Sequence, residues 1–327
     1  QAGIHAGIPK KAGAVTVHKV CGSGVRAVMD ASNGIRAGEW QVVVAGGMES
    51  MSNAPHLLER SRSGYRMGDF KVVDSMIKDG LWDPYGDKHM GSCAEMCAAK
   101  YQFSREAQDA FALRSYKRAQ AAAQSGLFDA EVVTVPVPQK KGEPVLVGRD
   151  EEPFTAPLEK MPSLKPAFEK TGTITAANAS KLNDGGAALI VTSADKARAL
   201  GKKPIARVVS YGTVADEPEW FTTAPIGAAK LALSRAGLKA SDIHRWEINE
   251  AFAVVTLAAI RDLDLDPERV NVRGGAIALG HPIGASGARI LTTLVHTLVH
   301  DKQRYGCLSI CIGGGEAAAM VVENLTL

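Results

Sequence analysis

The stretch VHKVCGSGVRAV, residues 17–28, joins an apolar β-branched run to a helix-like pattern through a Gly-Ser-Gly turn that carries Cys21. A second stretch, ASGARIL at 285–291, repeats the pattern of GSGVRAV at 22–28. Each copy is followed by a helical pattern, an apolar strand and a glycine pair. The repeat predicts a duplicated α/β fold, and such folds often bind a ligand between the copies, at the strand ends.

Composition places the chain among ordinary globular proteins. It has 327 residues, of which 46% are hydrophobic and 22% charged, enough for two or three packed domains. The net charge of +3 is too small to indicate a nucleic-acid or membrane partner. Five cysteines in so long a chain predict free thiols and a reducing compartment. We expect a cytoplasmic protein, with the mitochondrial matrix as the alternative.

Local patterns predict the order of the main elements. No apolar run is long enough to span a bilayer, and the first residues given lack the basic and hydrophobic pattern of a signal segment. The proline-rich segment 136–166 is expected to be extended and to lie outside any central sheet. The sequence predicts strands at 14–17, at 41–47 and within 173–193. It predicts one helix at 24–37, closed by Gly38, and another at 104–126, capped by Ser104. The segment 242–263 would contain a strand, a turn at Asn249 and a helix, and the second copy of the repeat would occupy 281–322.

Three reactive side chains lie beside glycine-rich turns: Cys21, His281 and Cys311. Together they could supply a nucleophile, an imidazole and a second thiol, as nucleophilic catalysis requires. A helix start would lower the pKa of the Cys21 thiol. The alternatives are a buried structural cysteine, a turn histidine and a buried strand residue. Cys307 shares a strand face with Cys311, but about 13 Å at ~3.3 Å per residue separates them.

A zinc site is a second hypothesis. His89, Cys93 and Cys97 follow an i, i+4, i+8 spacing that one helix face could present to a metal. Gly91 and Ser92 argue against a continuous helix from His89. The glycine-rich turns match neither a P-loop nor a dinucleotide fingerprint.

Taken together, the motifs KVCGSG (19–24), AGGMESMSN (45–53), NEAFA (249–253), GGAIALGHPIGASGAR (274–289) and CIGGG (311–315) resemble the thiolase family, in its order and approximate spacing. HMGSCAE (89–95), PVPQKKGEP (136–144) and TAANASKLNDG (175–185) are most similar to its acetoacetyl-CoA branch. The resemblance implies a five-layered αβαβα core in two halves. Residues 1–51 and 183–200 would form the N-terminal half, 52–182 an inserted loop domain that binds coenzyme A, and 201–327 the C-terminal half. It also implies a homotetramer.

The same resemblance assigns catalytic roles. Cys21 would be the acylated nucleophile, His281 its activator, and Cys311 the acid/base that moves the α-carbon proton of the second substrate. Asn249 would hold a water that forms one oxyanion hole with His281. The backbone amides of Cys21 and Gly313 would form the other.

Binding residues follow from the same motifs. The positions matching the pantetheine tunnel are Met90, Ala176, Ser180 and Phe252, and those matching the CoA phosphate contacts are Lys140 and Lys141. Core packing and a solvated turn are the respective alternatives. Some thiolases bind potassium through a tyrosine and backbone carbonyls, a suitable set of hard oxygen ligands. The matching positions are Tyr116, Ala176, Ala177, Ala179 and Ile277.

The implied activity is condensation of two acetyl-CoA molecules to acetoacetyl-CoA and CoA, and the reverse thiolysis, without a metal, flavin or nicotinamide in the chemistry. A 3-ketoacyl-CoA thiolase of longer chain preference is the nearest alternative. A non-catalytic acyl-CoA-binding relative and a Cys-His hydrolase are the others. Relative to the family, the chain lacks a leading segment of the N-terminal half.

Overall fold

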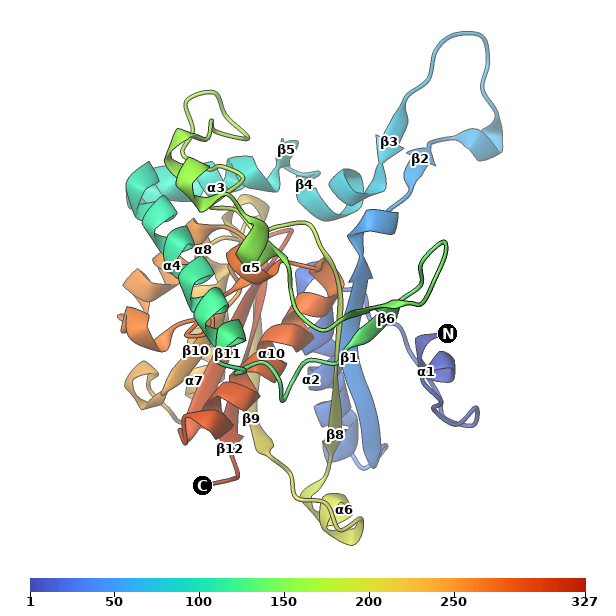
Figure 1. Ribbon diagram of the computed structural model, residues 1–327, viewed down its shortest axis with the longest axis vertical. Helices are drawn as coiled ribbons and strands as arrows, with labels where there is room; N and C mark the ends of the chain where they lie inside the picture. The colour runs from blue at the N-terminus through green and yellow to red at the C-terminus, as the bar shows by residue number, and fades with distance from the viewer.

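The computed structural model describes residues 1–327, and its elements form one four-stranded and four two-stranded sheets, with helices between and beside them (Figure 1). The helices are α1 Ala2–His5, α2 Ser23–Arg36, α3 Met90–Tyr101, α4 Arg105–Gln124, α5 Glu152–Thr155, α6 Ala194–Ala199, α7 Ala224–Ala236, α8 Ala253–Asp262, α9 Ala276–Leu279 and α10 Ile283–His300. The strands are β1 Val42–Ser50, β2 His56–Leu58, β3 Val72–Asp74, β4 Trp82–Asp83, β5 Lys88–His89, β6 Val135–Val137, β7 Val145–Val147, β8 Asp184–Thr192, β9 Ala206–Ala215, β10 Arg245–Ile248, β11 Tyr305–Ile312 and β12 Glu316–Asn324.

The larger sheet has the order β10-β11-β12-β9 and is buried on both faces. Alternate residues of β11 and β12 therefore enter two different cores. Cys307 and Cys311 pack with α3, α7 and α8, whereas Leu308 and Ile310 pack with α2 and α10. This burial on both sides explains why β11 and β12 are almost continuously apolar in sequence.

Helices α2 and α10 lie side by side between the larger sheet and the two-stranded sheet β1-β8 (Figure 1). Their first turns contain the two copies of the repeated motif. A Cβ on Gly24 would come within 2.5 Å of the backbone N of Ala288, and a Cβ on Gly287 within 2.6 Å of the backbone N of Val25. The repeated glycines thus allow the two helix starts to touch.

The sheet β1-β8 joins segments far apart in sequence, because β1 pairs antiparallel with β8 from Val42↔Thr192 to Ser50↔Asp184. Its inner face packs on α2 and α10. Its outer face carries exposed apolar side chains, among them Val44, Met48 and Ile190. The chain therefore supplies four layers in the order αβαβ, where the resemblance implied five.

Most predicted elements form where the sequence placed them. Helix α4 begins after Ser104, whose Oγ accepts a hydrogen bond from Ala107 N, and Gly38 follows α2 at φ +78°. The strand predicted at 14–17 is wrong. These residues are extended but mostly exposed, and they join no ladder, because no strand of the chain lies in register beside them. Helices are too short or too polar to cross a membrane.

Candidate active site

Two parallel strands bring the first pair of site residues to one sheet edge. β10 and β11 run parallel with Ile248 opposite Ser309, so both end at the same edge. Asn249 follows β10 directly, and its backbone N donates to Ser309 O at 3.0 Å. Cys311 lies one residue before the end of β11. Carboxyl ends of parallel strands are where α/β proteins place reacting groups.

Cys21 reaches the same edge from the turn before α2. It lies in a 3₁₀ turn, Val20–Gly22, and its sulfur accepts hydrogen bonds from the backbone amides of Gly313 and of Cys21 itself. A Cβ on Gly22 would come within 2.4 Å of Ile312 Cδ1, so any other residue here would require the Ile312 side chain to move. Val20 has φ +48°, a rare conformation for a β-branched residue and one that costs about 1–3 kcal/mol.

The pKa expected for Cys21 is wrong in direction. Burial raises the pKa of Cys21 to about 12, and the charge of Glu49 acts the same way, against the two amide hydrogen bonds. Burial also raises the pKa of Cys311, with Cys21 adding to the shift and the Asn249 side chain opposing it. The cost of desolvating the thiolate is larger than the stabilisation that the helix start gives it. Both sulfurs are therefore protonated at neutral pH, and acylation requires a base.

His281 is in the form that can act as this base. Burial, assisted by the charge of Arg289, lowers the pKa of His281 to about 4. Nδ1 lies 2.5 Å from Ser286 Oγ, whose hydroxyl donates to Pro282 O at 2.9 Å. Because the hydroxyl proton is already donated to Pro282 O, the Ser286 oxygen must accept a hydrogen bond from the Nδ1–H of His281. This assigns the tautomer and leaves the lone pair on Nε2.

Asn249 links the imidazole to the second thiol. Its Nδ2 lies 3.3 Å from His281 Nε2, and its side chain also hydrogen-bonds to Cys311. Its Oδ1 is buried and has no partner within the protein. The structure thus brings Cys21, Gly313, Cys311, Asn249 and His281 into one connected group, drawn from both copies of the repeat.

The positions matched to the pantetheine tunnel extend from this group. A Cβ on Gly313 would lie 3.6 Å from Met90 Sδ, which places Met90 beside the amide that faces Cys21. Phe252 is buried edge-on to Phe168, and Ser180 N donates to Ala251 O at 3.0 Å. Ala176 is exposed on the same loop as Ser180.

Lys140 and Lys141 lie elsewhere. They occupy the exposed turn between β6 and β7, and neither makes a hydrogen bond or an ion pair. Their role at the CoA phosphates stays a prediction.

The positions matched to potassium already hold a cation. Lys181 Nζ donates to the carbonyls of Ala176 at 2.6 Å and Ala179 at 3.2 Å. The Tyr116 hydroxyl donates to Glu152 Oε1 at 3.2 Å. Ala177 and Ile277 pack in the same apolar cluster as Tyr116, with Ile277 fully buried. The Lys181 ammonium thus occupies two of the carbonyl oxygens that the potassium prediction assigns to the ion.

The zinc hypothesis is wrong. The helix does run through Gly91 and Ser92, because His89 caps it and accepts from Gly91 N at 2.9 Å. His89 stacks on Phe168, whereas Cys93 and Cys97 are fully buried in the apolar core. No group of three or more potential metal-ligating side chains occurs. All five cysteines are free, as predicted.

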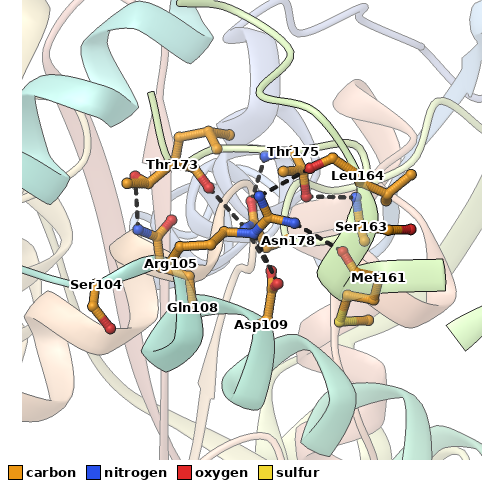
Figure 2. Close-up of polar contacts among 12 residues, drawn as sticks. Ser104, Arg105, Gln108, Asp109, Met161, Ser163, Leu164, Thr173, Thr175 and Asn178 are labelled. Carbon is orange, nitrogen blue, oxygen red and sulfur yellow. Dashed lines mark hydrogen bonds and ion pairs between the residues drawn. The ribbon is translucent and has the colours of Figure 1, made fainter. Parts of the chain in front are cut away.

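Sequence reasoning missed the polar network that holds the loop around residues 176–179 (AANA). Figure 2 shows Arg105 bonded to Asp109 and to the carbonyls of Met161 and Leu164. Asp109 in turn accepts from Asn178 Nδ2 at 2.9 Å, so α4 fixes the loop. Glu49 was missed too, and it accepts from Gly284 N at the start of α10. These contacts join segments that are far apart in the sequence, so no local sequence pattern predicts them.

Family models agree with this geometry. "Thiolase, N-terminal domain" matches residues 1–195, and "Thiolase, C-terminal domain" matches residues 202–324. The chain belongs to the thiolase family. This thiolase is 52% identical over 327 residues to the acetyl-CoA acetyltransferase of Cupriavidus necator, covering 99% of this chain and 83% of the relative.

Solved structures share the fold. The Acat5 thiolase of Ascaris suum, crystallised with coenzyme A, is 47% identical with a TM-score of 0.93, covering 98% of this chain and 82% of that one. The acetyl-CoA acetyltransferase of Bacillus anthracis is 40% identical with a TM-score of 0.96, covering 99% and 82%. The thiolase fold of this α/β chain is thereby confirmed.

Proposed function

We propose that this thiolase is an acetyl-CoA acetyltransferase that condenses two acetyl-CoA molecules to acetoacetyl-CoA and CoA, and catalyses the reverse thiolysis. One observation carries the proposal: a half-buried thiol, a fully buried thiol, one imidazole and a set of amide donors meet at one strand edge. The names of the relatives, acetyl-CoA acetyltransferases, and the coenzyme A bound to the Ascaris suum protein support it.

In the first half-reaction, the Cys21 sulfur attacks the thioester carbonyl. His281 Nε2 takes the thiol proton and delivers it to the departing CoA sulfur. The carbonyl oxygen becomes negative while the amides of Cys21 and Gly313 point toward the reacting sulfur. Preorganised donors of this kind stabilise a developing oxyanion. The products are acetyl-Cys21 and CoA.

In the second half-reaction, Cys311 first passes its proton to His281. The Cys311 thiolate then removes a proton from the α-carbon of the second acetyl-CoA, whose carbonyl oxygen becomes an enolate facing Asn249 and His281. The unpaired Asn249 Oδ1 suits a bridging water at this position. The enolate carbon attacks acetyl-Cys21, and the released Cys21 sulfur takes the proton back from His281. All three groups return to their starting forms.

The test is to incubate the protein with isotopically labelled acetyl-CoA, quench it with acid and map the label by mass spectrometry. We expect one acetyl group, on Cys21, and acetoacetyl-CoA in the supernatant. A label on another residue, or condensation without any acetyl-enzyme, would contradict the proposal. Chain length is tested by kcat/KM for acetoacetyl-CoA against a long-chain 3-ketoacyl-CoA, with the short substrate expected to be better.

A homotetramer is the assembly we propose. An exposed arm around β2 and β3 supports it, because the arm presents large apolar side chains, including Tyr65, Met67 and Phe70, on a segment too thin to bury them. The arm extends away from the body of the molecule (Figure 1). Sedimentation velocity tests the assembly, and a monomer at micromolar concentration would contradict it.

A further inference from the structure

The loop 175–181 holds both catalytic segments of the C-terminal half. Ser180 N donates to Ala251 O at 3.0 Å, and Ala253 N donates to Asn178 O at 2.9 Å, so the loop pairs with the segment that follows Asn249. His281 N donates to the carbonyl of Lys181 at 3.0 Å. Any displacement of this loop would therefore move the imidazole relative to Asn249.

The loop itself is held from two sides. On one side Asn178 bonds to Asp109 of α4 and to the backbone of Thr173 and Thr175 (Figure 2). On the other side the Lys181 side chain turns back over the loop and donates to the carbonyls of Ala176 and Ala179. The two carbonyl oxygens lie 2.6 and 3.2 Å from Nζ, so they converge on one positively charged group.

The surroundings of Lys181 Nζ complete the cation site. Nζ lies 5.7 Å from the centroid of the Tyr116 ring, within the range of a cation–π contact. The Glu152 carboxylate attracts the ammonium, and the Tyr116 hydroxyl holds that carboxylate. Burial lowers the pKa of Lys181 against this attraction. Two carbonyls, an aromatic face and a carboxylate all stabilise the single positive charge of the Lys181 ammonium.

We propose that the Lys181 ammonium is a built-in monovalent cation, a positioning residue that holds loop 175–181 against the Asn249 and His281 segments and makes the protein independent of potassium. A potassium ion would need the same two carbonyl oxygens, and it would lie beside a like charge in a partly buried site. The lysine and the ion therefore exclude each other.

The test uses two substitutions that differ in the space they leave. Lys181→Ala removes the charge and opens room for an ion, whereas Lys181→Met removes the charge and keeps the room filled. Lys170→Met, at an exposed lysine of the preceding segment, is the matched control. Each protein is assayed in potassium, ammonium, sodium and tetramethylammonium chloride at matched ionic strength. The readouts are KM and kcat for acetyl-CoA and hydrogen–deuterium exchange of loop 173–183.

For the wild type and Lys170→Met we expect the same kinetics and loop protection in every salt. In sodium or tetramethylammonium, both Lys181 variants should lose protection of the loop against exchange and show a KM about tenfold higher. A tenfold change is on the order of the contribution of one charge-assisted hydrogen bond. Potassium and ammonium should restore Lys181→Ala and leave Lys181→Met impaired.

Two results would overturn the inference: potassium dependence of the wild type, or unchanged loop exchange in both Lys181 variants. The inference rests on the proposed function for its kinetic readout only. If the wild type does not turn over acetyl-CoA, the proposed function fails, while the exchange measurement still decides the role of Lys181.

Discussion

At the residue scale, burial rather than helix position sets the chemistry of Cys21. The turn before α2 offers two amide donors, yet desolvation still raises the pKa of Cys21 to about 12. A cysteine in this state is a poor nucleophile until a neighbouring base removes its proton. The lowered pKa of His281 supplies a neutral imidazole for that purpose. The two opposite shifts have the same cause, because burial disfavours both the thiolate and the imidazolium.

The pH dependence of acetylation follows from this pair. Since the pKa of His281 is lowered to about 4, its neutral form persists below the range where an ordinary histidine titrates. The single-turnover rate of Cys21 acetylation should stay level from about pH 8 to about pH 6 and fall only on approach to pH 4. Rapid quench over this range measures it. A half-maximal rate near pH 6.5 would show that His281 titrates normally.

Ser286 tests the tautomer assignment. In Ser286→Ala the Nδ1 proton loses its acceptor, so a fraction of His281 should place the proton on Nε2, where it cannot act as a base. We expect acetylation to slow by about tenfold, the equivalent of a hydrogen bond of about 1.4 kcal/mol, and the ¹⁵N shifts of His281 to report mixed tautomers. Ser210→Ala is the control, because Ser210 also donates to a backbone carbonyl, Ala232 O, but in the β9–α7 packing. Equal kinetic losses in both variants would contradict a role specific to His281.

At the element scale, the contact between α2 and α10 fixes where the two copies meet. Each repeated serine donates to a backbone carbonyl just before it: Ser23 to Val20 O, three residues back, at 2.7 Å, and Ser286 to Pro282 O, four residues back, at 2.9 Å. The following glycines, Gly24 and Gly287, touch the backbone of the opposite helix. One copy of the motif thus presents Cys21, and the other presents His281.

Substitution of the contact glycines should separate the helices. Gly24→Ala and Gly287→Ala each force a methyl group against backbone atoms, and we expect each to lower the free energy of unfolding by about 1–3 kcal/mol. Gly227→Ala in α7 is the control: its methyl group would lie 3.4 Å from Val214 Cγ2, an ordinary contact. That variant should be neutral or gain up to about 1 kcal/mol from the helical preference of alanine. Urea denaturation measures all three, and a tolerated Gly24→Ala would contradict the close approach.

Helices with clear caps and doubly buried strands could be predicted from sequence, because their signals are local. Ser104, Gly38 and the apolar runs of β11 and β12 are examples. Residues 14–17 have the same β-branched composition as a strand, but a strand also needs a neighbour, which composition does not reveal. Gly91 was expected to interrupt the helix that became α3. The helix forms nevertheless, because the His89 side chain is oriented so that it caps the helix start, and composition does not reveal that orientation.

At the scale of the whole molecule, the site exists only where the two halves meet. The reactive positions Cys21, His281 and Cys311 could be found from sequence through their glycine-rich turns. Their protonation could not, because burial depends on the complete packing. The contacts of Lys181 and Ser286 were also not predicted. Lys181 donates to the carbonyls of its own loop and Ser286 bonds to the His281 imidazole, and no spacing rule identifies either contact.

The two thiols have different roles in the proposed mechanism, and the partial reactions of two variants distinguish those roles. Acetyl incorporation is measured by rapid quench beside steady-state formation of acetoacetyl-CoA. Cys311→Ala should still be acetylated on Cys21 yet lose condensation by about 10²–10⁴, the effect of removing a general base. Cys21→Ala should lose both reactions, because no acyl-enzyme can form. Condensation by Cys311→Ala at a near wild-type rate, or a covalent acetyl group on Cys21→Ala, would contradict the account.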